Sequence, residues 1–465
     1  MISHMYEGVV RDGRICKASR ALVLGAFSAL IVSAPLGALG ISCSLDPQSR
    51  MNAGRLQVGM TAFRGDMASD RLVRATKEAG IDFVVSYENL GGRAALDCLQ
   101  RHGLGCLLGG AVPRWWGGAG RNGKMAETFP LEVFETAAKG FVDHPVVWGI
   151  PIGDEPSALD LPHVGAVART VARVFPAQFP FICLFPIYAL PGGTARRTAA
   201  ESMLGVPTYD AYVAAACREL PMDFLMTDIY PWGWSVRRSQ FIENIRVISD
   251  AALGTGRRWG AVLQQNQCVS GPYTNRVMTA NTMRYQAFSA MAYGAEVFMW
   301  ACWAPIWWKD NFIEGGEVNP RAFVRLKTVN DELHAFSSHY MRFRRVTTDL
   351  VGVDRKAFDP RGDIRQAILP HGNGPVFHEV HTADESALAV GHMVARDGSG
   401  ASAMFVAAID DPEGKVDLEH ELLFRAARTP TLAVGNDGLR TLSSGDGGKY
   451  RVPIRSNQAV LVIAE

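Results

Sequence analysis

Eight short apolar runs, separated by segments of helical periodicity and by loops, fill residues 56–340. Each run has the length and the composition of a strand that is buried on both faces. Strands that alternate with helices predict a parallel sheet, and eight of them in a span of this size predict a closed (β/α)8 barrel. The runs are residues 56–63, 83–87, 106–112, 146–153, 179–185, 223–230, 259–264 and 297–303.

The turn after the first run argues against the alternative fold, an open doubly wound sheet. Such sheets carry a glycine-rich, phosphate-binding turn after their first strand. At this turn the chain reads Arg64-Gly65-Asp66-Met67, which contains one glycine. The sequence therefore assigns residues 55–340 to a catalytic TIM barrel of the α/β class.

From residue 341 to residue 465 the pattern changes to short alternating apolar runs, punctuated by Gly, Asp and Asn. This texture is typical of antiparallel sheets that pack face to face. We therefore expect a C-terminal β-sandwich domain. Its clearest runs are residues 387–393, 403–408, 432–434 and 459–463.

Residues 1–43 have the layout of a secretory signal peptide or an N-terminal anchor. Basic residues outnumber acidic ones in the first 20 positions, and residues 21–40 are apolar and rich in Ala, Gly and Ser. A stretch of this length can also stay in a membrane as an anchor. We expect an exported protein, secreted or held at the cell envelope, with residues 44–54 as a polar linker. The alternative is a cytosolic protein with an unusual apolar N-terminus.

Composition limits the partners and cofactors. The net charge is +1, with 48% hydrophobic and 20% charged residues, so we expect a globular chain without a nucleic-acid partner. The cysteines after residue 43 are scattered singly, without the spacing of a metal site. For His102, His144 and His163 we identify no second metal ligand at helical spacing, so no metal is expected. Flavin and nicotinamide motifs are absent from the sequence, so no cofactor is expected.

Two adjacent acids end the fourth apolar run. Asp154 and Glu155 stand between Gly153 and Pro156, where a buried strand gives way to a loop. In a (β/α)8 barrel the catalytic groups lie at the carboxyl ends of the strands, and glycosidic bonds are cleaved by a pair of carboxyl groups. Glu155 is the predicted general acid, because the charge of Asp154 raises the pKa of a neighbouring carboxyl. The alternative is that Asp154 caps the following helix and Glu155 is merely solvated.

Asp228 is the candidate for the second catalytic carboxylate. It lies near the end of the sixth run, two strands further around the barrel from Glu155. From there it can face the same pocket from another side. Asp154 is then expected to orient Glu155 or the substrate. The alternative for Asp228 is a structural hydrogen bond to a neighbouring loop.

Most of the ten tryptophans gather just after strand ends. An indole plane suits the apolar face of a sugar ring, so the expected ligand is a carbohydrate, whereas the alternative is ordinary packing in the loops. Those after strand ends are Trp115, Trp116, Trp232, Trp234, Trp303, Trp307 and Trp308. The predicted substrate-binding residues are Trp115, Trp116, Tyr230, Trp232, Gln264, Gln265 and Trp303.

Two segments resemble bacterial (β/α)8 glycoside hydrolases of the β-galactosidase-like clan, whose members can carry a C-terminal β-domain. They are Gly153-Asp154-Glu155-Pro156 and residues 228–232, Asp-Ile-Tyr-Pro-Trp. The resemblance implies that Asp154-Glu155-Pro156 is a variant of the clan's Asn-Glu-Pro acid/base motif, with Asp for Asn. Residues 293–300 are also similar to the approach to the clan's eighth strand.

The chain departs from that clan at the end of the seventh run. Retaining members carry a nucleophilic Glu there, whereas this chain has Gln264-Gln265, and an amide cannot form the glycosyl-enzyme ester. Asp228 can serve as base in an inverting mechanism or as nucleophile from another strand. Alternatively the N-acetyl group of the substrate attacks, with Asp154 and Glu155 as the acidic pair, as in enzymes similar to the hexosaminidases. We expect an exported glycoside hydrolase; the alternative is a non-catalytic barrel that binds carbohydrate.

Overall fold

The computed structural model describes residues 54–118, 120–131, 144–189, 203–233, 238–430, 432–435, 438–440, 442–445 and 448–465. The described residues all belong to one compact unit, Cys43–Glu465. The predicted signal peptide or anchor, nearly all of the predicted linker and Trp234 lie outside the described residues. No helix in the described part of the chain is both long and apolar enough to cross a membrane.

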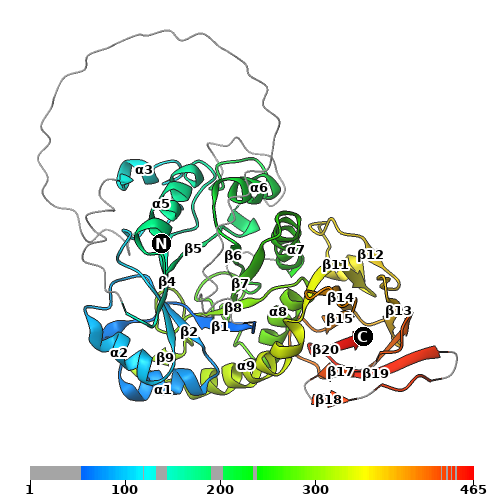
Figure 1. Ribbon diagram of the computed structural model, residues 1–465. Coiled ribbons are helices and arrows are strands. Elements are labelled where there is room, and N and C mark those ends of the chain that lie inside the picture. Colours follow the sequence, from blue (N-terminus) through cyan, green and yellow to red (C-terminus); the bar gives the residue numbers. More distant parts are fainter. Residues whose placement is uncertain are drawn as a thin grey trace, which may run out of the picture. The chain divides into compact units, whose positions relative to one another are not determined.

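Eight parallel strands form a closed barrel (Figure 1). Their order in the sheet is β5-β4-β3-β2-β1-β8-β7-β6, and a parallel bridge between Leu184 and Thr227 joins the two ends. The backbone N–H of Leu184 donates to the carbonyl of Met226 across this seam at 2.8 Å. The TIM barrel that the sequence predicts is confirmed. The strands are β1 Gln57–Met60, β2 Phe83–Ser86, β3 Gly105–Leu108, β4 Val147–Asp154, β5 Phe179–Cys183, β6 Phe224–Asp228, β7 Arg258–Gln264 and β8 Val297–Ala301.

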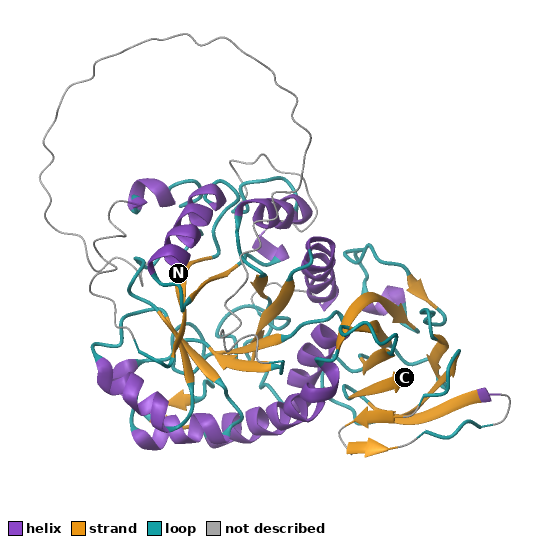
Figure 2. Ribbon diagram, viewed as in Figure 1, coloured by secondary structure: helices purple, strands orange, loops and turns teal. Residues whose placement is uncertain are grey.

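Helices lie on the outer side of these strands (Figure 2). Some of them begin with a side chain that satisfies the free backbone N–H groups: Ser69 accepts from Leu72 at the start of α1, and Thr279 with Thr282 forms a capping box at α8. The helices are α1 Asp70–Glu78, α2 Arg93–Arg101, α3 Met125–Thr128, α5 Leu161–Val174, α6 Tyr209–Glu219, α7 Arg238–Thr255, α8 Ala280–Ala292 and α9 Pro320–Tyr340. Short 3-10 turns lie at Gly65–Met67 and Ile187–Ala189, and β9 Ile313–Glu314 pairs with β10 Glu317–Val318.

Large aromatic side chains fill the barrel, and each of several lies against a glycine on a neighbouring strand. A Cβ added at Gly105 of β3 would lie 2.1 Å from the Trp148 ring of β4. A Cβ at Gly59 of β1 would lie 2.4 Å from the ring of Phe83. The glycines therefore leave the space that the aromatic rings occupy, and this packing fixes the strands whose ends carry the site.

Replacing Gly105 by Ala is expected to destabilise the barrel by about 1–3 kcal/mol, because the Trp148 ring or the backbone must move. The matched control is Gly254→Ala in α7, where an added Cβ meets no atom within 4 Å and alanine is the better helix former. Midpoints of chemical denaturation should fall for the first variant and not for the second. Equal midpoints in both variants would contradict this account of the packing.

The C-terminal region is a β-sandwich, as predicted. A seven-stranded sheet has the order β12-β11-β14-β15-β20-β17-β18, and a three-stranded sheet has the order β13-β16-β19. Apolar side chains of both sheets, such as Val406 of β15 and Phe424 of β16, form one buried core. The strands are β11 Phe343–Val351, β12 Ile368–Leu369, β13 Phe377–Thr382, β14 Leu388–Ala395, β15 Ser402–Ala408, β16 Glu419–Ala426, β17 Leu432–Gly435, β18 Gly438–Arg440, β19 Lys449–Arg455 and β20 Ala459–Ala464, with α10 at Arg355–Phe358.

Candidate active site

The fourth and sixth strands bring the three predicted acids to the same end of the barrel. Asp154 is the last residue of β4, Glu155 follows it, and Asp228 is the last residue of β6. The backbone of Glu155 is in the left-handed region, with φ +46°, which is rare for a residue other than glycine. Strained backbone of this kind concentrates at functional sites, where the surrounding structure must hold it.

The backbone around Glu155 is held from three sides. Its N–H donates to the carbonyl of Cys183 on β5 at 2.9 Å. On the other side the chain passes so close that a Cβ on Gly117 would lie 2.0 Å from the Glu155 carbonyl oxygen. The hydroxyl of Tyr212 donates to the carbonyl of Pro156 at 2.8 Å and accepts from the N–H of Phe185 at 3.1 Å. These contacts fix the direction in which the Glu155 side chain points.

The carboxyl groups of Glu155 and Asp228 are close enough that each affects the pKa of the other. Asp228 is 9% exposed, and its Oδ1 is buried without a hydrogen-bond donor among the described groups. The protonated carboxyl group of Glu155 can supply the donor that Asp228 lacks. The indole Nε1 of Trp116 donates to Glu155 Oε2 at 2.5 Å. The pair therefore has the arrangement of a proton held between two carboxyl groups.

Burial raises the pKa of all three acids. For Glu155, burial and then the charges of Asp228 and Asp154 hold the pKa well above its ordinary value, against the lowering effect of the Trp116 hydrogen bond. Burial, followed by the charge of Asp154, raises the pKa of Asp228 to about 7. Burial raises the pKa of Asp154 to about 6, although the positive charge of Arg114 opposes the change. Near neutral pH, Glu155 is thus the acid that keeps its proton.

Three tyrosines and a cysteine complete the surroundings of the acids. Burial raises the pKa values of Tyr188 and Cys183 well above normal, with the charge of Asp228 as the next cause. Burial and the charge of Asp154 do the same for Tyr87. The hydroxyl of Tyr230 interacts with Asp228 and acts to lower the pKa of that carboxyl. These side chains stay neutral and can offer hydrogen bonds to the hydroxyl groups of a ligand.

A cleft of about 570 Å³ is lined in part by Tyr87 and Arg114, and this is a usual volume for a small-molecule site. Tyr87, next to Asp154, belongs to both the cleft and the acid site. Arg114 in the wall donates to Glu88 at 3.2 Å and lies over the Tyr87 ring. The walls therefore combine apolar rings with polar groups, as a sugar ring requires. They are formed by Ala62, Phe63, Arg64, Gly65, Asp66, Ser86, Tyr87, Glu88, Asn89, Leu90, Gly91, Arg114, Pro305 and Ile306.

Three of the predicted substrate-binding residues lie near the acids. Trp116 contacts Glu155 directly, and Tyr230 interacts with Asp228. Trp115 is 4% exposed and packs beside Gly153, the residue that precedes the two acids. Trp115 therefore supports the end of β4 and exposes little surface to a ligand.

Gln264 and Trp232 are parts of the framework instead. The Gln264 side chain accepts from the backbone N–H of Trp232 at 3.0 Å and donates to its carbonyl at 3.3 Å. Trp232 is 1% exposed, and its ring packs on Tyr285 and under Arg276. Gln264 is therefore hydrogen-bonded within the protein, and the Trp232 ring exposes almost no surface to a ligand.

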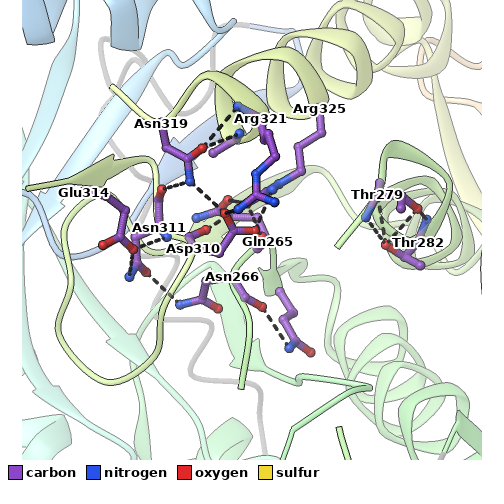
Figure 3. A network of polar contacts seen from close by, with 12 residues as sticks. Gln265, Asn266, Thr279, Thr282, Asp310, Asn311, Glu314, Asn319, Arg321 and Arg325 are labelled. Carbon is purple, nitrogen blue, oxygen red and sulfur yellow. Dashed lines mark hydrogen bonds and ion pairs between the residues drawn. The ribbon is translucent and has the colours of Figure 1, made fainter. Parts of the chain in front are cut away.

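Gln265 and Trp303 are also buried away from the acids. Gln265 accepts from Arg325 at 3.0 Å and donates to the carbonyl of Cys302 at 3.0 Å, in a network that also holds Asp310 (Figure 3). Trp303 is completely buried and donates to Thr76 in α1 at 2.9 Å. A ring without exposed surface has no face to offer a sugar. Both side chains are thus engaged within the protein in this structure.

Replacing Trp116 by Phe should shift the pH dependence of activity without abolishing it. The indole N–H lowers the pKa of Glu155, so its loss should raise that pKa further. If Glu155 must be protonated, the alkaline limb of the kcat/KM profile should move to higher pH, while the maximum falls by about 10-fold or less. An alkaline limb that stays in place, or moves to lower pH, would contradict the role of Trp116.

No protein-family model and no curated protein matches the chain. Solved structures that resemble it include an endo-β-1,4-mannanase from Thermotoga petrophila, 11% identical, which covers 87% of this chain and 98% of its own at a TM-score of 0.39. A family 51 α-L-arabinofuranosidase from Bifidobacterium longum is 11% identical, and the match covers 89% of this chain and 96% of that enzyme at a TM-score of 0.40. A maltogenic α-amylase from Thermotoga neapolitana is 9% identical, and the match covers 90% of this chain and 99% of that enzyme at a TM-score of 0.46. Scores below 0.5 carry no information about the activity of this chain.

Proposed function

We propose that the protein is a glycoside hydrolase that cleaves glycosidic bonds in an oligosaccharide or polysaccharide by carboxyl acid/base catalysis. One observation carries the proposal: Asp154, Glu155 and Asp228 converge at the carboxyl ends of β4 and β6, and burial raises the pKa of each. Burying three acids together costs stability, and such an arrangement is typical of a site that performs acid/base chemistry.

In this proposal Glu155 donates its proton to the oxygen of the leaving group. Its raised pKa keeps it protonated near neutral pH, and Trp116 fixes the orientation of its carboxyl group. Asp228 is the second carboxylate, and Asp154 orients Glu155 or the substrate. The sugar occupies the neighbouring cleft, with Tyr230 and Trp116 near the reacting bond.

The stereochemistry follows from how Asp228 acts once a substrate separates the two carboxyl groups. Retaining enzymes hold their carboxyl groups about 5 Å apart, and inverting ones about 6.5–9.5 Å, to admit a water molecule. The anomer of the first product, followed by NMR, distinguishes retention, by Asp228 or by an N-acetyl group of the substrate, from inversion.

Export is part of the proposal, on the basis of the basic and apolar composition of residues 1–43. An enzyme for polymeric carbohydrate must meet its substrate outside the cytoplasm when the polymer cannot enter. Cell fractionation, with mass determination of the mature N-terminus, tests this location and separates a cleaved signal from a retained anchor.

The test of the activity is a hydrolysis screen of the protein without residues 1–43 on aryl glycosides and polysaccharides. Release of the aryl alcohol or of reducing ends supports the proposal. If no substrate is cleaved and a glycan raises the melting temperature, the alternative of a carbohydrate-binding barrel takes its place. The second candidate rests on Gln264, which stands where the retaining clan that the chain resembles has its nucleophile.

A further inference from the structure

Helices α1 and α2 bring three side chains of metal-binding type together outside the active site. The ligand atoms of Asp70, Cys98 and His102 all lie within 4.8 Å of one another. The two helices are neighbours on the outside of the barrel (Figure 1). None of the three residues contributes to the acid site at the ends of β4 and β6.

Cys98 lies in α2, and His102, four residues later, is the residue that caps the carboxyl end of this helix, so the two side chains lie on the same side of its last turn. Cys98 is therefore the second ligand at helical spacing that the expectation of no metal site overlooked. Asp70 is the first residue of α1 and supplies the third donor from the facing helix. A ligand pair within one helix and a third ligand from another element can fix a metal ion between them.

The three side chains form a site that opens to solvent on one side. Cys98 is 3% exposed and forms the inner wall, whereas the Asp70 side chain is 59% exposed. His102 Nε2 lies 2.9 Å from Asp70 Oδ1, so imidazole and carboxylate already face the same point. Arg101 reaches the same Asp70 oxygen at 3.4 Å, and this exposed guanidinium must move aside when a cation enters.

We propose that Cys98, His102 and Asp70 bind a zinc-type divalent cation, with water as the fourth ligand, and that the ion joins α1 to α2. Thiolate, imidazole and carboxylate are the donors that Zn²⁺ uses at tetrahedral sites. Burial raises the pKa of the Cys98 thiol, so the thiol carries its proton in the metal-free protein. On binding, the sulfur–metal bond forms, the S–H bond breaks and the proton leaves to solvent.

The test is a titration of the purified full-length chain with Co²⁺, followed by optical absorption. A thiolate-to-cobalt charge-transfer band that saturates at one equivalent, and that Zn²⁺ abolishes, is the expected result. Cys98→Ser should lose the band, whereas Cys217→Ser, which removes a half-buried thiol of α6, should keep it. Asp70→Asn and His102→Gln should weaken Co²⁺ binding by at least about 10-fold, the size of effect known for outer-shell partners.

The Asp70→Asn variant distinguishes loss of binding from misfolding, because Asp70 is on the surface and the substitution is not expected to disturb folding. Circular dichroism checks that this variant is folded. The proposal is overturned if the wild type shows no band, if the band survives in Cys98→Ser, or if folded Asp70→Asn binds Co²⁺ as tightly as the wild type. The readout is independent of hydrolysis, so it stands or falls apart from the proposed glycosidase activity.

Discussion

Replacing Glu155 by glutamine is expected to lower kcat/KM for polysaccharide hydrolysis by about 10²–10⁴-fold, the usual contribution of a positioned general acid. Glutamine keeps the size of the side chain and can still accept from Trp116, but it has no proton to give to the leaving oxygen. The amide N–H of glutamine can still donate toward Asp228, so the variant removes the transferable proton and keeps a donor beside the buried carboxyl.

The control for this variant is Glu78→Gln at the end of α1, which removes an exposed carboxylate that pairs only with Arg74 among the described residues. Initial rates on the best substrate of the screen give the comparison. The control should retain the activity of the wild type, since a surface pair of this kind contributes at most about 1 kcal/mol to stability. Glu155→Gln with the activity of the control would remove Glu155 from the mechanism.

Replacing Asp228 by asparagine is expected to abolish most activity and, at alkaline pH, to raise the melting temperature. Burial and the charge of Asp154 raise the pKa of Asp228 from 3.8 to about 7. The folded protein thus binds this proton more tightly than the unfolded chain, so the contribution of Asp228 to stability is full below pH 3.8 and is lost as the pH rises through 7. A neutral amide avoids the burial of that charge.

Thermal unfolding at pH 8 and pH 5 measures this effect. The Asn variant should melt at least about 2 °C above the wild type at pH 8, and the difference should shrink toward pH 5. Greater stability together with lost activity is what a strained functional site predicts. If the variant is less stable than the wild type at pH 8, Asp228 serves the structure, which is the alternative that its sequence position leaves open.

The barrel could be predicted from the sequence because strands that are buried on both faces have nearly continuous apolar sequences. All eight runs contain strands in the structure, although β1 ends at Met60 and β3 at Leu108, before the predicted ends at residues 63 and 112. The start of α9 at Pro320 is signalled by the Asn319 cap and by the proline, and not by apolar periodicity. In the sandwich, β16 and β19 alternate with charged residues along an exposed face and were missed.

The three acids could be predicted because a strand end fixes which end of the barrel a residue occupies. The sequence does not fix whether a side chain at that end points toward the ligand or into the framework. Gln265 and Trp303 stand at strand ends, yet their polar atoms bind Arg325 and Thr76. The proton between Glu155 and Asp228 and the pairing of Cys98 with Asp70 depend on side chains from different elements, so the structure was needed to find them.

The central claim, that Glu155 protonates the leaving group of a glycoside, is tested most directly by two aryl glycosides of the same sugar. One releases dinitrophenolate, which leaves without protonation. The other releases a methylumbelliferyl group, whose departure is faster when a general acid protonates it. For Glu155→Gln relative to the wild type, we expect kcat/KM to fall by about 100-fold or more on the second substrate and to change little on the first. An equal loss on both substrates, or no loss on either, would contradict the assignment of Glu155 as the general acid.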